Sequence, residues 1–335
     1  MIDAALIWEW IIKAVVILLV MTGGFAYVTW YERRALAKMQ VRIGPNRVGW
    51  QGLLQPVADG IKLIFKEELI PEGADKFIFV LAPVITVIPA LIITAVVPWG
   101  TSVTIAGREI PLYLADINVA VLYIMSVTSI SIYGITLAGW SSNNKYAMLG
   151  GLRATAQMIS YELALGMAFV GPILWAGSMS MSAIVEAQKN LWFVVIMPLG
   201  FVIYLIASLA EVNRSPFDMP EAEQELTAGY HVEYSGMKFA LFFMAEYIKM
   251  IAVSMIGATL FLGGYQGPFV DAFPWLGPVY LFIKIVLWLF FMIWVRATLP
   301  RFRYDRLMAF GWKILVPLSL LYIVITAVLR LMVGG

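Results

Sequence analysis

The chain alternates between long runs of apolar residues and shorter segments that carry most of its charges. Eight runs are long enough to cross a bilayer, because a helix of about 20 apolar residues spans a hydrocarbon core of roughly 30 Å. They cover approximately residues 11–31, 77–99, 116–138, 156–177, 190–211, 238–262, 276–297 and 310–331. A helix satisfies its own backbone hydrogen bonds in lipid. The pattern therefore predicts an all-α integral membrane protein with eight transmembrane helices.

The composition supports this membrane assignment. Hydrophobic residues make up 61% of the 335 residues and charged residues 13%, whereas a soluble domain has about 45–50% and about 25%. No stretch reads as a separate soluble domain, so we expect residues 1–335 to form a single membrane domain. The first run lacks a basic head and a small-residue cleavage site, and we expect it to be a permanent span.

The charges lie asymmetrically along the chain. Most of the 23 Lys and Arg residues fall in the connections after the first, third, fifth and seventh runs. An excess of Lys and Arg marks the cytoplasmic side of a membrane protein. Both termini are therefore predicted to be external.

Cofactor chemistry within this chain is restricted by its residue types. It has no cysteine, and His231 is its only histidine. This excludes an iron–sulfur cluster, a bis-histidine haem or a cysteine zinc site held by this chain alone. No nucleotide-binding glycine motif is present. We therefore expect no metal and no cofactor bound by this chain, and any electron carriers in other subunits.

The first cytoplasmic loop, residues 32–76, is long for a connection without a function. Apolar residues recur in it at helical spacing, at Trp50, Leu53, Leu54, Val57, Ile61 and Ile64. The pattern predicts an amphipathic helix in the membrane interface. Such a helix is either a surface anchor or one wall of an entrance for a lipid-borne ligand. Pro56 and Gly60 lower helix stability, so spacing does not decide between these two interpretations.

The third cytoplasmic loop, residues 211–238, is acidic where the other inside loops are basic. Its carboxylates are Glu211, Asp218, Glu221, Glu223, Glu225 and Glu233, against Arg214. Asp218 and Glu221 have the spacing of a capping box, with Pro220 in the first turn of a short helix. The loop is either a solvated acidic surface or a proton-handling cluster, because closely packed carboxylates raise each other's pKa.

Ionisable residues within the runs are costly in lipid and are functional hypotheses by default. Glu162 lies in the fourth run and has no close partner in sequence. Glu246 and Lys249 are spaced i,i+3 in the sixth run, where they could form either a structural ion pair or part of a proton relay. Lys284 lies in the seventh run without an acid nearby in sequence.

Three segments of the chain resemble a known family. They read ERRALAKMQVRIGPNRVGWQGLLQPVADGIKLIFKE, GWSSNNKYAMLGGLRATAQMISYELALG and EVNRSPFDMPEAEQELTAGYHVEYSGMKFALFFMAEY. These strings are similar to the H subunits of bacterial NADH:quinone oxidoreductase and to the mitochondrially encoded subunit 1 of complex I. The resemblance runs from about Tyr27 to Phe310, and the third string is the most specific.

The resemblance implies roles for particular residues. A quinone chamber is implied for Glu32, Arg33, Arg34, Gln40, Arg42 and Asp59, with Gly44, Pro45 and Asn46 in the same loop. A proton relay is implied for Glu162, Glu211, Asp218, Glu221, Glu223, Glu225, Glu233 and Glu246. The basic partners of these acids are Arg153, Arg214, Arg296 and Arg301, together with Lys249 from the sequence spacing.

The resemblance also implies partners and a location. The expected function is that of a membrane subunit of proton-translocating NADH:quinone oxidoreductase, in a bacterial inner membrane. Peripheral subunits would supply the terminal iron–sulfur cluster and the Tyr and His that bind the quinone headgroup, and flavin would also lie outside this chain. Small and antiporter-like membrane subunits and lipid complete the contacts, with no nucleic acid. The alternatives are a subunit of a related F420H2 dehydrogenase or energy-converting hydrogenase, or a stand-alone ion-coupled transporter.

Overall fold

The molecule is a bundle of long apolar helices, seen in a computed structural model that describes residues 4–105, 108–218 and 229–334. In that part of the chain, seven helices are long and apolar enough to cross a membrane. Six of them are α1 (Ala4–Met39), α3 (Lys76–Ile92), α4 (Ala120–Ser141), α5 (Lys145–Ala176), α10 (Gly236–Phe261) and α11 (Leu276–Thr298). The seventh combines α12 (Tyr304–Phe310), a π-helical segment (Gly311–Leu315) and α13 (Val316–Gly334). A shorter apolar helix, α8, spans Pro198–Glu211.

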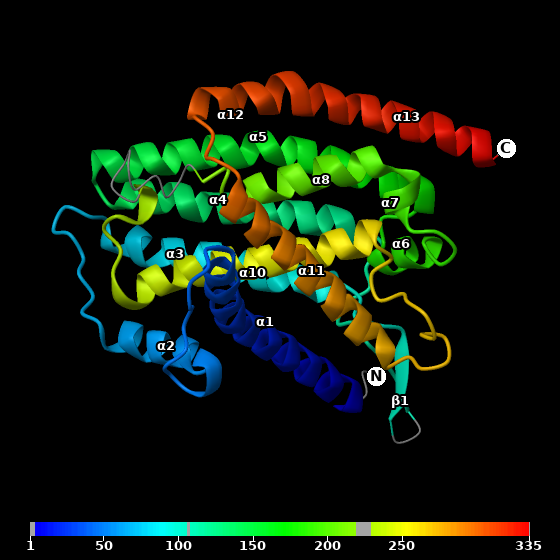
Figure 1. Cartoon of the computed structure of the whole chain (residues 1–335), viewed down its shortest axis with the longest axis horizontal. Helices are drawn as coiled ribbons and strands as arrows, with labels where there is room; N and C mark the ends of the chain where they lie inside the picture. Colours follow the sequence, from blue (N-terminus) through cyan, green and yellow to red (C-terminus); the bar gives the residue numbers. More distant parts are fainter. Residues whose placement is uncertain (1–3, 106–107, 219–228, 335) are drawn as a thin grey trace.

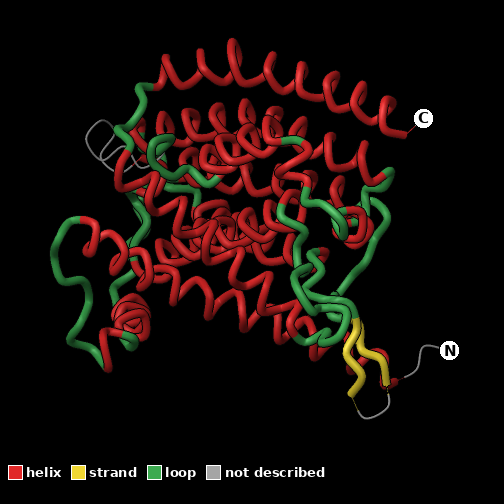
Figure 2. The backbone as a smooth tube through the Cα atoms, turned by 45° about the vertical axis from the view of Figure 1, so that its right-hand side comes forward, coloured by secondary structure: helices red, strands yellow, loops and turns green. Residues whose placement is uncertain are grey.

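The helices pack side by side, with α1 and α13 at opposite edges (Figures 1 and 2). Helix α3 packs on α4, α4 on α5, and α5 on both α8 and α13, while α10 contacts α3, α11 and α1. The apolar stretch of α10 is 67% buried inside the protein, against 11% for that of α1. Charged side chains on α10 are therefore enclosed by protein, whereas most of α1 faces outward.

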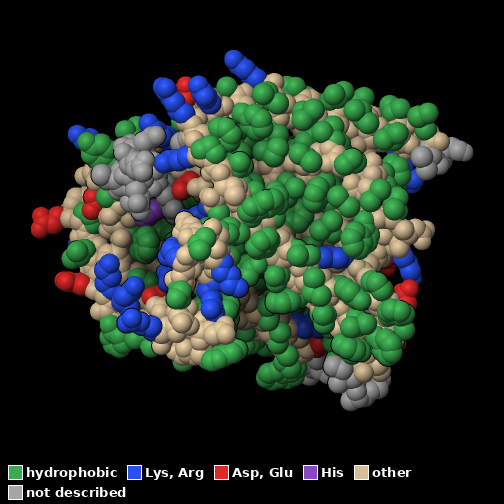
Figure 3. Space-filling model, in the orientation of Figure 1, with side chains coloured by type: hydrophobic (Ala, Val, Ile, Leu, Met, Phe, Trp, Pro, Cys, Tyr) green, Lys and Arg blue, Asp and Glu red, His purple; other side chains and the backbone are tan. Residues whose placement is uncertain are grey.

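The two ends of the bundle differ in character. One end, called here the hairpin end, holds both termini, β1 (Ser102–Ile105), β2 (Arg108–Pro111), α6 (Met181–Ala187) and α7 (Phe193–Ile196) (Figure 1). The opposite loop end holds α2 (Gln55–Phe65) and α12. Figure 3 shows Lys, Arg, Asp and Glu side chains gathered at the loop end, beside a broad hydrophobic face. This face suits contact with lipid or apolar partner surfaces.

A small hairpin departs from the expected all-α architecture. Strands β1 and β2 pair antiparallel, with Ser102 opposite Pro111 and Ile105 opposite Arg108. Polar and apolar residues alternate along β1, which is the period of a strand. The hairpin lies at one end of the bundle, so the membrane-spanning part is helical as predicted.

The predicted run 190–211 is not one continuous helix. Helix α7 ends at Ile196 and α8 begins at Pro198, because Met197 between them has non-helical angles (φ −132°, ψ 62°). Proline lacks a backbone N–H and fits only the first turn of a helix. Helix α8 has 14 residues, a length of about 21 Å. It ends at Glu211, so this shorter helix carries a candidate carboxylate at its terminus.

The helix predicted in the first loop starts later than the apolar spacing indicated. Helix α2 begins at Gln55, and residues Trp50–Gly52 form a separate short turn. Gly52 has a φ of +78°, and a Cβ added there would lie 2.3 Å from the Pro45 carbonyl oxygen. The backbone therefore turns sharply at Gly52, which prevents one helix from covering the whole apolar pattern.

Lys284 has backbone carbonyls as its partners. Its Nζ donates to the carbonyl oxygens of Leu262, Gly264 and Gln266 at 2.6, 2.7 and 2.7 Å. The ammonium also lies over the Trp192 ring, 4.6 Å from its centroid. All three donors of the lysine are thus used at the hairpin end. Lys284 joins α11 to the segment that follows α10, away from the acids at the loop end.

Candidate functional site

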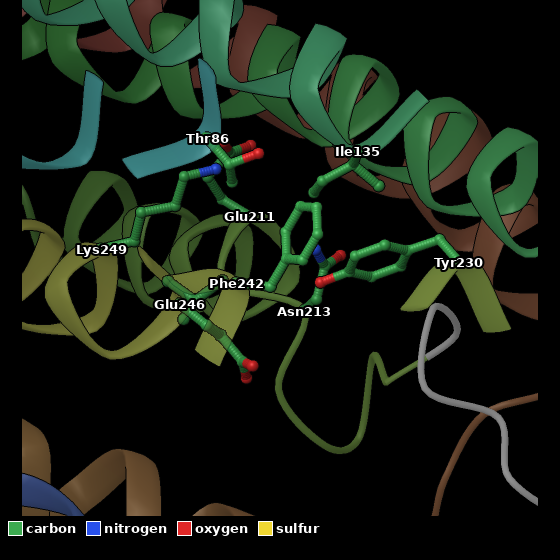
Figure 4. A pocket seen from close by; sticks show the side chains of 9 residues that line it. Thr86, Ile135, Glu211, Asn213, Tyr230, Phe242, Glu246 and Lys249 are labelled. Carbon is green, nitrogen blue, oxygen red and sulfur yellow. The ribbon is translucent and has the colours of Figure 1, made fainter. Parts of the chain in front are cut away.

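A small internal cavity brings together charged residues from α8 and α10. Glu211 and Lys249 are 1% and 8% exposed, and both line a cavity of about 20 Å³ together with Thr86, Asn213 and Glu246. In Figure 4, Glu211 and Lys249 reach toward the same side of the cavity, while the Glu246 carboxylate points away from them. A buried carboxylate beside a buried ammonium is an arrangement in which protonation of one alters the charge felt by the other.

Glu162 belongs to the same electrostatic group. Its carboxylate is half-buried on α5 and accepts hydrogen bonds from Ser129 Oγ and, at 3.4 Å, from Thr128 Oγ1. Its charge acts on both Glu211 and Lys249. Helices α5, α8 and α10 each contribute one charged side chain to this first cluster, which consists of Glu162, Glu211 and Lys249.

A second cluster lies around Arg214. The Arg214 Nε is 2.8 Å from Glu246 Oε1, and one of its terminal nitrogens is 3.6 Å from Glu32 Oε1. Glu32 also accepts hydrogen bonds from Arg296 and, at 2.6 Å, from Tyr247 Oη. The Arg214 guanidinium lies over the Tyr247 ring at 4.3 Å. These five residues form a buried ion network that joins α1, α10 and α11 to the turn after α8.

The two clusters are connected through shared elements. Glu211 and Arg214 belong to the same turn at the end of α8, and Glu246 and Lys249 lie on adjacent turns of α10. The charged side chains therefore form a continuous series from Glu162 on α5 to Glu32 on α1. Such a series of carboxylates with intervening cations can hold and redistribute protons.

The pairing predicted on α10 differs from the one observed. Glu246 is paired with Arg214, and no ion pair of Lys249 is found among the residues that the structure describes. Lys249 instead faces Glu211 across the cavity. The i,i+3 spacing allows a Glu–Lys contact, but the turn after α8 brings a guanidinium closer to Glu246.

The quinone-chamber residues predicted in the first loop divide into two groups. Arg33 pairs with Asp59 at 2.7 Å, and Arg34 donates to the Gln51 backbone and side-chain oxygens at 3.0 and 2.9 Å. These bonds tie α2 and the turn before it to α1. Arg42 donates to Gln40 at 2.7 Å, and both are exposed. The remaining predicted residue is Glu32, which belongs to the Arg214 network instead.

Residues near Tyr234 connect the third loop to its neighbours. Glu233 accepts a hydrogen bond of 2.7 Å from Asn144, which also caps α5. Burial raises the pKa of Tyr234 to about 12, despite its hydrogen bond with Ser141. The Tyr234 ring stacks on Phe79, with centroids 4.0 Å apart. This segment is thus held against α3, α4 and α5 in a defined position.

The other predicted site residues lie around the loop end. Arg153 lies over the Tyr304 ring at 5.8 Å. Arg301 is in the turn after α11, where the next residue, Phe302, donates its N–H to the Pro216 carbonyl at 3.1 Å. Asp218 is the last described residue before a gap. Glu221, Glu223 and Glu225, and the short helix predicted around Pro220, lie outside the described residues.

Some residues of the site were not identified from the sequence. Tyr247 contacts Glu32, and Ser129 and Thr128 contact Glu162. A signal existed for the two hydroxyls, because they lie in a run without charges where polar side chains need partners. Within the described residues, no group of three His, Asp or Glu side chains could hold a metal ion.

The chain is similar to known proteins along nearly its whole length. A sequence model for the NADH dehydrogenase family matches residues 12–327. The H subunit of the NADH-quinone oxidoreductase of Thermomicrobium roseum is 51% identical over 326 residues, 94% of each chain. The second H subunit of the enzyme of Syntrophobacter fumaroxidans is 50% identical over 97% of this chain and 96% of its own. The H subunit from Syntrophotalea carbinolica is 53% identical over 90% of both chains.

Proposed function

The chain belongs to the NADH dehydrogenase family, and from this premise we propose that its buried charged series couples quinone reduction to proton translocation. The chain is a membrane subunit of an oxidoreductase complex and contains no complete active site of its own. In this proposal, quinone is the substrate, and it is reduced by electron carriers of partner subunits. The flavin and the iron–sulfur clusters belong to those partners.

The observation that carries the proposal is the continuous series of charges inside a membrane protein. Glu211, Lys249, Glu32 and Arg214 are each less than a tenth exposed. Charges buried in a membrane protein are costly and mark proton or ion pathways. A simple structural pair needs two charges, whereas these residues connect four helices from α5 to α1. This arrangement supports a relay that reaches from the loop end into the bundle.

The first loop supports a role as the wall of a quinone chamber. Apolar side chains of α2 are largely exposed, among them Val57, Ile61 and Ile64 at 55%, 51% and 60%. We propose that this face lies in the membrane interface as an amphipathic helix, and that the Arg33–Asp59 pair holds α2 beside α1. A hydrophobic quinone would then pass between them from the bilayer into the complex.

The proposed chamber is tested by replacing Asp59 with Ala. The change removes the acceptor that Arg33, Gln55 and Lys62 share, so α2 should be held less firmly against α1. We expect quinone reduction by the assembled complex to fall by about tenfold, while electron transfer from the donor to a hydrophilic acceptor is unchanged. Asp271→Ala is the matched control, because it removes an exposed ion pair at the hairpin end.

The two activities separate the possible outcomes for Asp59→Ala. Loss of both activities in equal proportion would show a defect of assembly and contradict a specific role in quinone access. Normal quinone reduction in the assembled complex would also contradict it.

We further propose that the chain crosses the membrane eight times, with both termini external. In support, both termini lie at the hairpin end (Figure 1), which requires an even number of crossings. The seven long helices reach this number if α8 crosses together with α7. Lys and Arg gather at the opposite end, as expected for a cytoplasmic side. The proposed location is the inner membrane of a bacterium.

Single cysteines introduced into this cysteine-free chain test the topology. We expect residues near Lys66 and Arg303 to react with an impermeant thiol reagent only from the cytoplasmic side, and a residue near Gln266 only from outside. Membranes without the partner subunits give access to sites that those subunits would cover. Labelling of the Lys66 region from outside would contradict the proposed orientation.

A further inference from the structure

One buried amide outside the charged series holds the turn that carries two of its members. Gln157 lies on α5 and is 0% exposed. Its Nε2 is 2.9 Å from the Ala210 carbonyl oxygen, 2.7 Å from the Phe217 carbonyl oxygen and 3.1 Å from Asn213 Oδ1. A single side chain thus bonds both ends of the segment 210–217.

The segment bonded by Gln157 has little internal support beyond its own turns. Its backbone bonds run from Val212 to Ser208, from Arg214 to Leu209 and from Phe217 to Arg214. Asn213 has a φ of +54°, a left-handed conformation that is uncommon for a residue other than glycine. The chain reverses here directly after α8, so a contact from another helix determines where the reversal lies relative to α5.

The charged residues on this segment point to opposite partners. Glu211 lines the cavity with Lys249, and Arg214 contacts Glu246 and Glu32. Glu162 follows Gln157 on α5 by little more than one helical turn. The Gln157 amide therefore links the helix that carries Glu162 to the turn that carries Glu211 and Arg214.

We propose that Gln157 is a positioning residue of the relay, which keeps Glu211 and Arg214 in register with Glu162. This proposal rests on the proposed function. The chemistry requires an amide at this position, because the two hydrogens of its NH2 group face three oxygen acceptors. A carboxylate of the same shape would have no hydrogen to donate and would face the same three oxygens. Displacement of a transfer group by about 1 Å can lower a rate by about a hundredfold.

The test compares two buried glutamines in the assembled complex. Gln157→Met keeps the length of the side chain and removes its donors. Gln188→Met is the matched control, because Gln188 is also 0% exposed and its amide donates to the Ile184 and Thr259 carbonyls at the hairpin end. We expect Gln157→Met to lower kcat for quinone reduction by about tenfold or more per assembled complex and to shift the pH optimum. The KM for quinone and transfer to a hydrophilic acceptor should stay unchanged. Gln188→Met should change none of these values per assembled complex.

A second variant covers the case in which Gln157→Met does not assemble. Gln157→Asn retains the two donors on a shorter side chain that cannot reach both carbonyls at once, and we expect an intermediate loss of kcat. Wild-type kcat and pH profile in either assembled Gln157 variant would overturn the proposal, as would equal losses at Gln157 and Gln188. Glu162→Gln measured in parallel separates the two claims: if it alone lowers turnover, the relay stands and the positioning role falls. If Glu162→Gln has normal turnover, the relay itself is contradicted.

Discussion

In an assembled complex that carries Glu162→Gln, quinone reduction and proton translocation are expected to fall together by about a hundredfold. The amide keeps the shape of the side chain and can still accept hydrogen bonds from Ser129 and Thr128. It has no proton that titrates, and it removes one of the charges that act on Glu211 and Lys249. The relay then lacks its contribution from α5, and no other described carboxylate occupies that position.

The measurement needs both activities and a control for the loss of a surface charge. Turnover with quinone and the proton gradient are recorded in membranes, and both are normalised to the amount of assembled complex. Glu109→Gln serves as the control, because Glu109 is exposed in the hairpin and lies at the opposite end of the bundle from the loop-end acids. Normal turnover and normal pumping with Glu162→Gln would exclude this residue from the relay. A complex that reduces quinone at the normal rate without pumping would show that the two steps are not tightly linked.

Arg214→Met is expected to lower the stability of the protein more than any other single change discussed. It leaves Glu246 and Glu32 without the guanidinium that lies 2.8 and 3.6 Å from them. Removing one partner of a buried ion network costs about 3–5 kcal/mol, because an uncompensated charge remains inside the protein. The Arg214 stacking on Tyr247 is lost as well. We expect little of the protein to be present in membranes.

The amount of the protein in membranes and its thermal unfolding in detergent measure this effect. Arg303→Met is the matched control, because Arg303 and Asp305 are 81% and 62% exposed, and such a surface pair contributes about 1 kcal/mol or less. Adding Glu246→Gln to Arg214→Met should restore part of the loss, since it removes one of the unpaired carboxylates. Wild-type levels and stability for Arg214→Met would contradict a structural role of the network.

The sequence was informative about the candidate site where an ionisable residue stood alone in an apolar run. Glu162, Glu246 and Lys249 were identified in this way, and the structure brings them close to Glu211 and Arg214 of the third loop. The partners of each charge could not be predicted. Spacing along α10 suggested Glu246 with Lys249, whereas the backbone reversal after α8 brings Arg214 to Glu246. Glu32 was grouped with its neighbours in the first loop, although the helix directs it toward Arg296 and Tyr247.

The sequence by itself determined that this is a helical membrane protein and approximately where its helices lie. The predicted ranges 238–262 and 276–297 differ by at most two residues from α10 and α11, because lipid requires long apolar segments and each such segment satisfies its own backbone. Only the tertiary structure decided the break at Met197, the hairpin and the pairing of buried charges. These features depend on contacts between segments far apart in the chain, such as Gln157 with Phe217 and Arg296 with Glu32, which no local period encodes.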